Sequence, residues 1–240
     1  MIRIVMPSRS RPAVIAHRGD CAAAHENTIE AFRDAIAAGA DGIEFDVRRT
    51  ADGALVVHHD NTIGQSLLAR VDYPTGQALA EALGYTLPLL SDVLAETRGR
   101  IQLDVELKEG GYEEEVVALL EDAGLPLDDF VVTTFDPPSL LRVRAIAPAV
   151  RTGLLLEKID WTQALDAFRR STAHFLAPHK TMIDEAGLAA AHEHGVELVV
   201  WTVNDPAMMR RLFRAPAVTG VITDRPAEAL RVRRETLAPS

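Results

Sequence analysis

Cysteine is almost absent from this sequence, since Cys21 is the only one in 240 residues. A single thiol cannot form an internal disulfide, which excludes a disulfide-stapled fold and favours a reducing compartment. Long apolar runs are also missing, because none approaches the ~18 residues of a membrane span. The N-terminal residues lack the apolar core of a secretory signal. We therefore expect a cytoplasmic protein without stable membrane insertion.

Basic residues are in the minority, with 25 Lys and Arg against 35 Asp and Glu, and the formal net charge is −10. This balance argues against nucleic acid as a partner. The one short basic cluster, Arg231, Arg233 and Arg234, is interpreted as a solvated helix face. Low-complexity runs are missing as well, so we expect residues 1–240 to form a single folded domain, monomeric or homo-oligomeric.

The sequence does contain a regular alternation of strand-like and helix-like segments. An Asp52-Gly53 turn after the second strand is a strong hairpin signal, and it brings residues 54–59 back antiparallel. The weakly patterned stretch 62–87, which Tyr73-Pro74 interrupts and in which only 77–83 looks helical, is expected to be a small insertion over a site. The eight remaining strands are expected at 13–17, 42–47, 101–107, 130–135, 151–156, 174–177, 197–203 and 220–223, with a helix between each and the next.

Eight strand–helix units in a chain of 240 residues predict a closed (β/α)8 TIM barrel, an α/β fold. An open, doubly wound sheet is the alternative, but it would not predict polar residues at so many strand ends. Barrels carry their chemistry at the carboxyl ends of the strands and in the loops that follow. We therefore expect the functional side chains to meet there.

Two of the predicted strands carry acids on one face. Side chains alternate along a strand, so Glu44 and Asp46 share a face in the second strand, and Glu106 lies on the polar face of the next. Three bunched carboxylates repel one another unless a cation or protons intervene, and an all-oxygen set suits Mg²⁺, Ca²⁺ or Mn²⁺. The alternative is that each acid caps a loop or pairs with an arginine. Asp104, one layer deeper, is expected in a buried network.

Basic and imidazole groups stand at the same strand ends. Arg18 and Lys108, beside a divalent cation, predict a phosphate pocket, although they could merely neutralise the acids. His17 and His59 end strands beside the acids, where a pair can divide general-base and general-acid work near neutral pH. The other histidines are interpreted as structural or solvated, and Cys21 as a packing residue.

The order and spacing of these motifs are highly specific. They are His17-Arg18-Gly19, Glu26-Asn27-Thr28, Ile43-Glu44-Phe45-Asp46-Val47, Asp52-Gly53, His59-Asp60, Glu106-Leu107-Lys108, Trp201-Thr202-Val203-Asn204 and the segment 220–226. From residue 13 to about 228 the chain resembles the glycerophosphodiester phosphodiesterase family.

The resemblance implies a TIM barrel that hydrolyses small glycerophosphodiesters, such as glycerophosphocholine and glycerophosphoethanolamine, to glycerol 3-phosphate and an alcohol. Two departures bear on the alcohol side: Arg-Thr does not follow His59-Asp60, and Leu89 stands where threonine is common. The roles implied are one divalent cation on Glu44, Asp46 and Glu106, acid/base catalysis by His17 and His59, phosphate binding by Arg18 and Lys108, and Trp201 on the glycerol side.

Two other functions remain open at this stage. A related enzyme on the same barrel could cleave lysophospholipids or sphingolipids, for which residues 62–87 would need to form an apolar lid with Leu67, Leu68, Leu79 and Leu83. The chain could also be a silent phosphodiester-binding module. That reading predicts the loss of a histidine or an acid, and none is lost.

Overall fold

The structure is a computed structural model that describes residues 11–238, so residues 1–10, on which the prediction of a missing secretory signal rests, lie outside the described part. Its main sheet closes on itself in the order β1-β11-β10-β9-β8-β7-β6-β2, because β1 also pairs with β2, and these pairings are all parallel. The predicted barrel is thereby confirmed. Its strands are β1 (Ala13–His17), β2 (Gly42–Arg49), β6 (Gln102–Leu107), β7 (Phe130–Thr134), β8 (Arg151–Leu156), β9 (Phe175–Pro178), β10 (Glu197–Val200) and β11 (Val218–Thr223).

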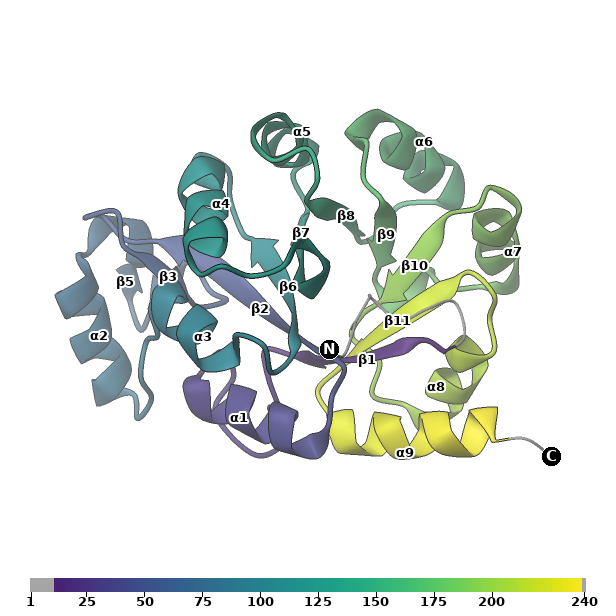
Figure 1. Cartoon of the computed structure of the whole chain (residues 1–240), viewed down its shortest axis with the longest axis horizontal. Helices are drawn as coiled ribbons and strands as arrows, with labels where there is room; N and C mark the ends of the chain where they lie inside the picture. The colour runs from purple at the N-terminus through teal and green to yellow at the C-terminus, as the bar shows by residue number, and fades with distance from the viewer. Residues whose placement is uncertain (1–10, 239–240) are drawn as a thin grey trace.

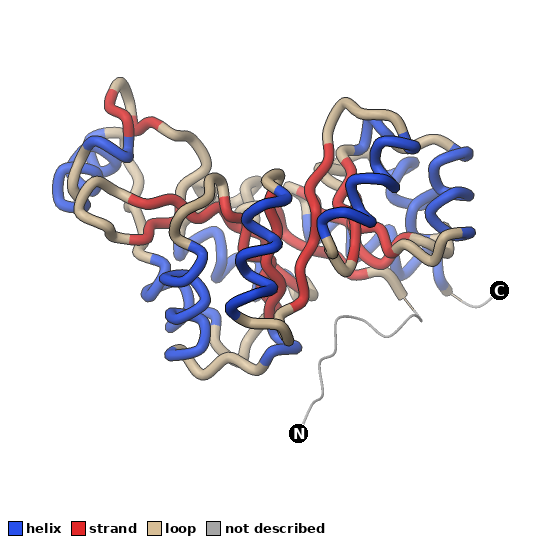
Figure 2. The backbone as a smooth tube through the Cα atoms, turned by 90° about the horizontal axis from the view of Figure 1, so that it is seen from above, coloured by secondary structure: helices blue, strands red, loops and turns tan. Residues whose placement is uncertain are grey.

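Helices cover the outside of the barrel, as Figures 1 and 2 show from two directions. Most begin at an aspartate or threonine that accepts a backbone N–H of the first turn, and Asp160 forms a complete capping box with Gln163. Among the described residues, no helix combines the length and apolarity needed to cross a bilayer. The surrounding helices are α1 (Ile29–Ala38), α3 (Leu90–Thr97), α4 (Glu113–Asp122), α5 (Pro137–Ile146), α6 (Trp161–Ser171), α7 (Glu185–Glu193), α8 (Pro206–Phe213) and α9 (Pro226–Leu237), and short 3₁₀ turns occur at Leu68–Arg70, Leu127–Asp129 and Lys180–Met182.

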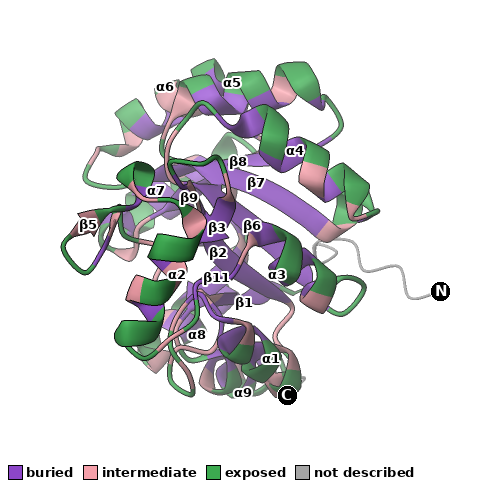
Figure 3. Ribbon diagram, turned by 90° about the vertical axis from the view of Figure 1, so that its left-hand side faces the viewer, coloured by how far each residue is buried: buried purple, intermediate pink, exposed green. Residues whose placement is uncertain are grey.

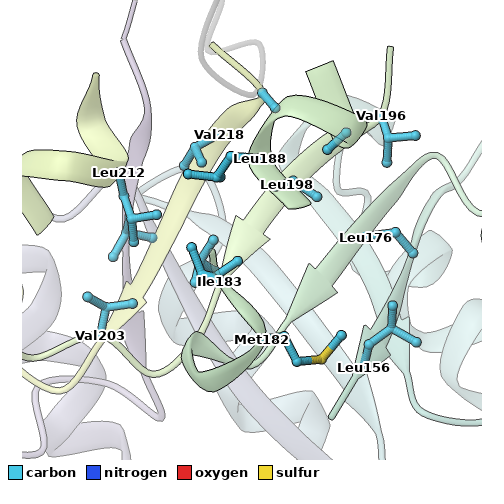
Figure 4. Close-up of a cluster of buried hydrophobic side chains, with 14 of the residues drawn as sticks. Leu156, Leu176, Met182, Ile183, Leu188, Val196, Leu198, Val203, Leu212 and Val218 are labelled. Carbon is cyan, nitrogen blue, oxygen red and sulfur yellow. The ribbon is translucent and has the colours of Figure 1, made fainter. Parts of the chain in front are cut away.

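The strands are buried on both faces, and Figure 3 shows them enclosed by helices whose outer sides are exposed. Alternate strand residues therefore enter different cores. Ile15, Leu155 and Ile222 fill the barrel interior. Leu156 and Leu198 face outward into a larger cluster under α6, α7 and α8, which Figure 4 shows in close-up. This alternation decides which side chains reach the mouth of the barrel.

The predicted hairpin after β2 is confirmed: β3 (Leu55–Val57) pairs antiparallel with β2. Its turn contains Gly53 at φ 88°, a conformation that glycine adopts without strain. The following insertion contains β4 (Thr62–Ile63), β5 (Ser66–Leu67) and α2 (Tyr73–Ala82), and it packs on a small core of its own around Ile63 and Leu68.

Helix α2 begins earlier than the helical pattern at 77–83 suggests. Pro74 stands in the first turn of the helix, where the backbone N–H that proline lacks would have no partner within the helix. Asp72 caps the helix by accepting a hydrogen bond from Thr75 N. Residues that look like a break in the pattern therefore form a helix start.

The prediction that the C-terminal arginines form a solvated helix face is wrong for Arg233. This side chain is buried, donates to Pro12 O at 2.9 Å and forms an ion pair with Asp41. Asp41 in turn accepts from Val14 N at 2.8 Å. Figure 1 shows α9 lying beside α1, so this contact ties the last helix to the first strand–helix unit.

Candidate active site at the carboxyl ends of the strands

A pocket of about 290 Å³ opens at the carboxyl ends of the strands. A hollow of about 470 Å³ lies at the opposite end of the barrel, where it borders Pro12 and the starts of β10 and β11, but none of the described residues forms an acidic cluster there. The candidate chemistry therefore belongs to the smaller pocket. Its lining residues are His17, Arg18, Glu44, His59, Glu106, Lys108, Phe135, Leu155, Glu157, Trp201 and Ile222.

The three acids named by the sequence come together at the floor of this pocket. Strands β2 and β6 are adjacent and parallel, and their register places Asp46 opposite Glu106. One oxygen from each of Glu44, Asp46 and Glu106 lies within 4.8 Å of the others, and all three residues are at most 7% exposed. Their oxygens Glu44 Oε1, Asp46 Oδ1 and Glu106 Oε1 are buried without a hydrogen-bond donor in suitable geometry.

Two cations lie against these acids. The Lys108 ammonium is 2.6 Å from Glu106 Oε1 and 3.3 Å from Asp46 Oδ1, and Arg18 Nε is 3.1 Å from Asp46 Oδ2. Burial raises the pKa of Asp46, but Lys108, Arg18 and a hydrogen bond from Asn27 Nδ2 (2.8 Å) outweigh it, so the net shift is downward. Asp46 is therefore ionised at neutral pH.

The cations compensate the other two acids less well. Burial, followed by repulsion from Asp46, raises the pKa of Glu44 well above its ordinary range and that of Glu106 to about 7. A divalent cation would supply the missing positive charge and could bind the buried oxygens of the three acids. The residues thus fit a hard cation, and the acidic cluster could hold one.

Asp104 lies deeper in the barrel, as the sequence suggests. It accepts a hydrogen bond from Thr133 Oγ1 at 2.6 Å and is 4% exposed. Burial raises its pKa to about 7. Asp104 is a buried network residue beneath the candidate site.

The loop after β1 holds Arg18 in an unusual backbone conformation. Arg18 has φ 56° and Gly19 has φ 89°, both in the left-handed region that non-glycine residues rarely adopt. A Cβ at Gly19 would lie 2.7 Å from Ala31 of α1, so only glycine fits there. Arg18 Nη1 donates to both carboxylate oxygens of Glu26 at 2.9 and 3.0 Å, which fixes the guanidinium over the pocket.

His17 is oriented by a chain of hydrogen bonds from the end of β11. Its Nδ1 lies 2.6 Å from Asp224 Oδ1, and Asn204 Nδ2 donates to Asp224 Oδ2 at 2.5 Å. Burial raises the pKa of Asp224, but these two hydrogen bonds outweigh it and leave the pKa below its ordinary value. An ionised Asp224 can only accept, so Nδ1 carries the proton and Nε2 points toward Glu44, whose Oε2 is 3.9 Å away.

His59 lies in the loop after β3, on the rim of the same pocket. Its Nδ1 lies 2.8 Å from Asp60 Oδ1, and its backbone carbonyl accepts from Arg48 Nε at 2.7 Å. Burial lowers the pKa of His59, although Asp46 and Asp60 raise it in part. The Nε2 of the neighbouring His58 instead lies 3.0 Å from Thr62 O, and His58 does not line the pocket, in agreement with its interpretation as a structural or solvated residue.

An aromatic pair forms another wall of the pocket, next to Lys108, whose Nζ is 6.0 Å from the centroid of the Phe135 ring. The rings of Trp201 and Phe135 pack edge to face with their centroids 5.6 Å apart, and His179 packs against the other side of Trp201 at 4.9 Å. Trp201 Nε1 donates to Ala177 O at 2.7 Å, so the indole is locked in place. The pocket thus has one charged side and one mainly apolar side.

Comparison with known proteins identifies the family. The profile of the glycerophosphoryl diester phosphodiesterase family matches residues 17–228, a range that contains every residue of the candidate site described above. A glycerophosphodiester phosphodiesterase of Caldanaerobacter subterraneus subsp. tengcongensis is 31% identical, over 92% of this chain and 98% of its own. The chain belongs to the glycerophosphoryl diester phosphodiesterase family.

Solved structures of similar proteins share the fold of this family member. The glycerophosphodiester phosphodiesterase of Thermotoga maritima superimposes with a TM-score of 0.77 at 26% identity, over 92% of this chain and 98% of its own. An Oleispira antarctica phosphodiesterase, in complex with the product sn-glycerol-3-phosphate, does so with a TM-score of 0.82 at 23% identity, over 92% and 96%. As a member of the glycerophosphoryl diester phosphodiesterase family, the protein is a phosphodiester hydrolase.

Sequence reasoning assigned no role to several residues of this phosphodiesterase that contact the site. Asp224 and Asn204 follow strand ends, and that position was the available signal, but Asp224 contacts His17 across 207 residues of sequence and Asn204 reaches His17 only through Asp224. Asn27 and Glu26 belong to a recognised motif, and the structure adds their partners, Asp46 and Arg18.

Proposed function

We propose that this phosphodiesterase hydrolyses glycerophosphodiesters, such as glycerophosphocholine and glycerophosphoethanolamine, to glycerol 3-phosphate and an alcohol, and that it needs a divalent cation. The observation that carries the proposal is the meeting of a buried acidic triad, two cationic side chains and two histidines around one pocket. The related Oleispira protein holds sn-glycerol-3-phosphate, which supports a small-molecule substrate of this class.

Glu44, Asp46 and Glu106 would hold the cation, with Mg²⁺ or Ca²⁺ as the preferred ions and Mn²⁺ as a further candidate. When bound, the cation would stabilise negative charge on the phosphoryl oxygens. Arg18 and Lys108 are both anchored to acids through some of their N–H groups and would offer others to the phosphate. These preorganised charges would bind the diester and favour charge that develops during displacement.

His17 and His59 would move the protons. One takes a proton from the nucleophile and the other gives one to the departing alkoxide, and each such step is typically worth about 10² to 10⁴ in rate. The nucleophile is water or the 2-hydroxyl of the glycerol itself, which would give a cyclic phosphate first. A substrate that lacks this hydroxyl separates the two routes, because undiminished turnover would exclude the cyclic one.

The test removes each imidazole in turn. His17→Ala and His59→Ala should each reduce turnover of glycerophosphocholine by 10² or more, with thermal unfolding and cation binding unchanged. His58→Ala is the matched control and should stay active, since its ring lies against Thr62 O and is not among the residues that line the pocket. Substantial activity in either His17→Ala or His59→Ala would contradict the assignment of acid/base roles.

The lysophospholipase or sphingolipid reading finds limited support in the insertion. Of its four leucines, Leu68 is buried and Leu79 packs in the insertion's own small core, while Leu67 and Leu83 are 39% and 57% exposed. A continuous apolar lid needs more exposed apolar surface than two side chains. Comparing glycerophosphocholine with lysophosphatidylcholine as substrates decides between the two functions.

The silent binding module is disfavoured because every acid and histidine that the catalytic hypothesis needs is present and lies at the pocket floor or rim. A cytoplasmic location, a single domain spanning residues 1–240, and a monomeric or homo-oligomeric state stay predictions.

A further inference from the structure

Glu157 is an acidic side chain on the otherwise apolar side of the pocket. In β8, Leu155 faces the barrel interior while Leu154 and Leu156 face outward into the helix layer. Side chains alternate along the strand, so Glu157, directly after it, continues the face of Leu155 and lines the pocket. Its position at the mouth is thus set by the register of the strand.

Glu157 stands across the mouth from His17 and Arg18. In the closed sheet, β8 is four strands from β1 in both directions, through β11, β10 and β9 one way and through β2, β6 and β7 the other. A molecule whose phosphate lies beside His17 and Arg18, at the end of β1, therefore extends toward Glu157 when it extends across the barrel.

The other groups on this wall cannot pair with a hydroxyl. Phe135 and Leu155 are apolar, and the single donor of the Trp201 indole is already bonded to Ala177 O at 2.7 Å. Among the residues that line this side, Glu157 alone can accept a hydrogen bond through its side chain. Its ion-pair partner is its neighbour Lys158 at 3.2 Å, whose side chain is 81% exposed, so the pair lies in water and is weak.

We propose that Glu157 accepts a hydrogen bond from the terminal hydroxyl of the substrate's glycerol and thereby selects glycerol diesters. The inference rests on the proposed function and on the expectation, implied by the resemblance to the family, that Trp201 lies on the glycerol side. A locked aromatic wall with one anionic acceptor suits a three-carbon chain, whose C–H groups lie on the rings while an O–H reaches the carboxylate.

The geometry favours the terminal hydroxyl for two reasons. The 2-hydroxyl is adjacent to the carbon that bears the phosphate, so the terminal hydroxyl reaches further toward the wall opposite the phosphate. Glycerol is also the part that all the proposed substrates share, whereas the alcohol varies, so a fixed recess is useful for the glycerol.

The test compares glycerophosphocholine with 2-hydroxypropyl phosphocholine, which lacks only the terminal hydroxyl. The wild-type enzyme should prefer glycerophosphocholine by about tenfold to a hundredfold in kcat/KM, the usual value of a hydrogen bond to a charged group. Glu157→Leu should remove this preference by slowing glycerophosphocholine alone. Lys158→Met, which removes the ion pair but keeps the carboxylate, should retain the preference.

Three results would overturn the inference: an unchanged preference in Glu157→Leu, an equal loss on both substrates, or a loss confined to cationic head groups. The last is checked with glycerophosphoglycerol and would show that Glu157 binds the head group instead.

Binding measured by calorimetry separates this inference from the proposed function, because it needs no turnover. Glycerol 3-phosphate should bind more tightly than 2-hydroxypropyl phosphate, and Glu157→Leu should remove the difference. If the wild-type protein shows this difference yet cleaves no glycerophosphodiester, the inference stands and the proposed function fails. If the wild-type protein cleaves glycerophosphodiesters but shows no difference in binding, the proposed function stands and the inference fails.

Discussion

Replacing Asp224 with asparagine should impair catalysis more than its isosteric shape suggests. Asn204 cannot turn over its amide, because its Oδ1 accepts from Thr223 Oγ1 at 2.9 Å and from the backbone N–H of Asp224 at 3.0 Å. Its NH₂ group therefore always faces residue 224. In Asp224→Asn the new amide must offer its oxygen to Asn204, which turns its own NH₂ toward His17.

This reversal changes which ring nitrogen of His17 carries the proton. An NH₂ facing Nδ1 requires Nδ1 to accept, so the proton moves to Nε2, the nitrogen that faces the pocket. A neutral His17 in this tautomer cannot take a proton through Nε2. A protonated His17 would place its Nδ1–H against the NH₂ group of the new amide, so two donors would face each other. Whichever role His17 has, the expected loss in kcat is about 10² to 10⁴, which is the value of one proton-transfer step.

Steady-state hydrolysis of glycerophosphocholine, with glycerol 3-phosphate as the measured product, gives the comparison. Asp224→Ala is the matched variant: it leaves Nδ1 to water, so either tautomer can form, and it should retain more activity than Asp224→Asn. Thermal unfolding checks that both variants are folded. An Asp224→Asn enzyme with more than half of the wild-type kcat would refute the orienting role of Asp224, as would an Asp224→Ala enzyme that is the less active of the two.

Two further predictions follow from charges buried in the fold. The affinity for a divalent cation should fall as pH is lowered through about 7, because protons compete for Glu106, whose pKa is about 7, and for Glu44, whose pKa is also raised. Calorimetric titration with Mg²⁺ or Ca²⁺ at pH 6 and pH 8 measures this change in affinity. Equal affinities at the two pH values would contradict the prediction. Arg233→Met should lower the free energy of unfolding by about 3 kcal/mol, since it leaves Asp41 without its buried partner. Denaturant unfolding measures the second effect, turnover at 25 °C should be unaffected, and a change below 0.5 kcal/mol would show that water replaces Arg233 at Asp41.

The parts of the site that lie on regular strands could be predicted from sequence. Glu44, Asp46 and Glu106 were placed together by the two-residue period of two neighbouring strands, and the register of β2 with β6 brings their oxygens within 4.8 Å of one another. A period fixes the face of a side chain without any knowledge of distant contacts. That is why the acidic cluster was accessible to pattern alone.

Contacts between distant segments could not be predicted in this way. The partner of Arg233 is 192 residues away, and composition alone suggested that an arginine-rich helix faces water. The start of α2 was missed for a local reason: Tyr73-Pro74 reads as a break unless the capping by Asp72 is recognised. The roles of His17, His59 and Trp201 in turnover stay predictions, although the structure places all three around one pocket.

The closure of the barrel also constrains how the chain can be made. Strand β1 lies between β2 and β11, so one of its edges stays bare until residues 218–223 have left the ribosome. Asp41 likewise gains its ion pair with Arg233 only when helix α9 has been made. A nascent chain thus carries an uncovered strand edge until β11 has been made, which is a hazard for aggregation. Strand β11 thus closes the barrel and also brings Asp224 to His17, so closure and the orientation of this imidazole depend on the same strand.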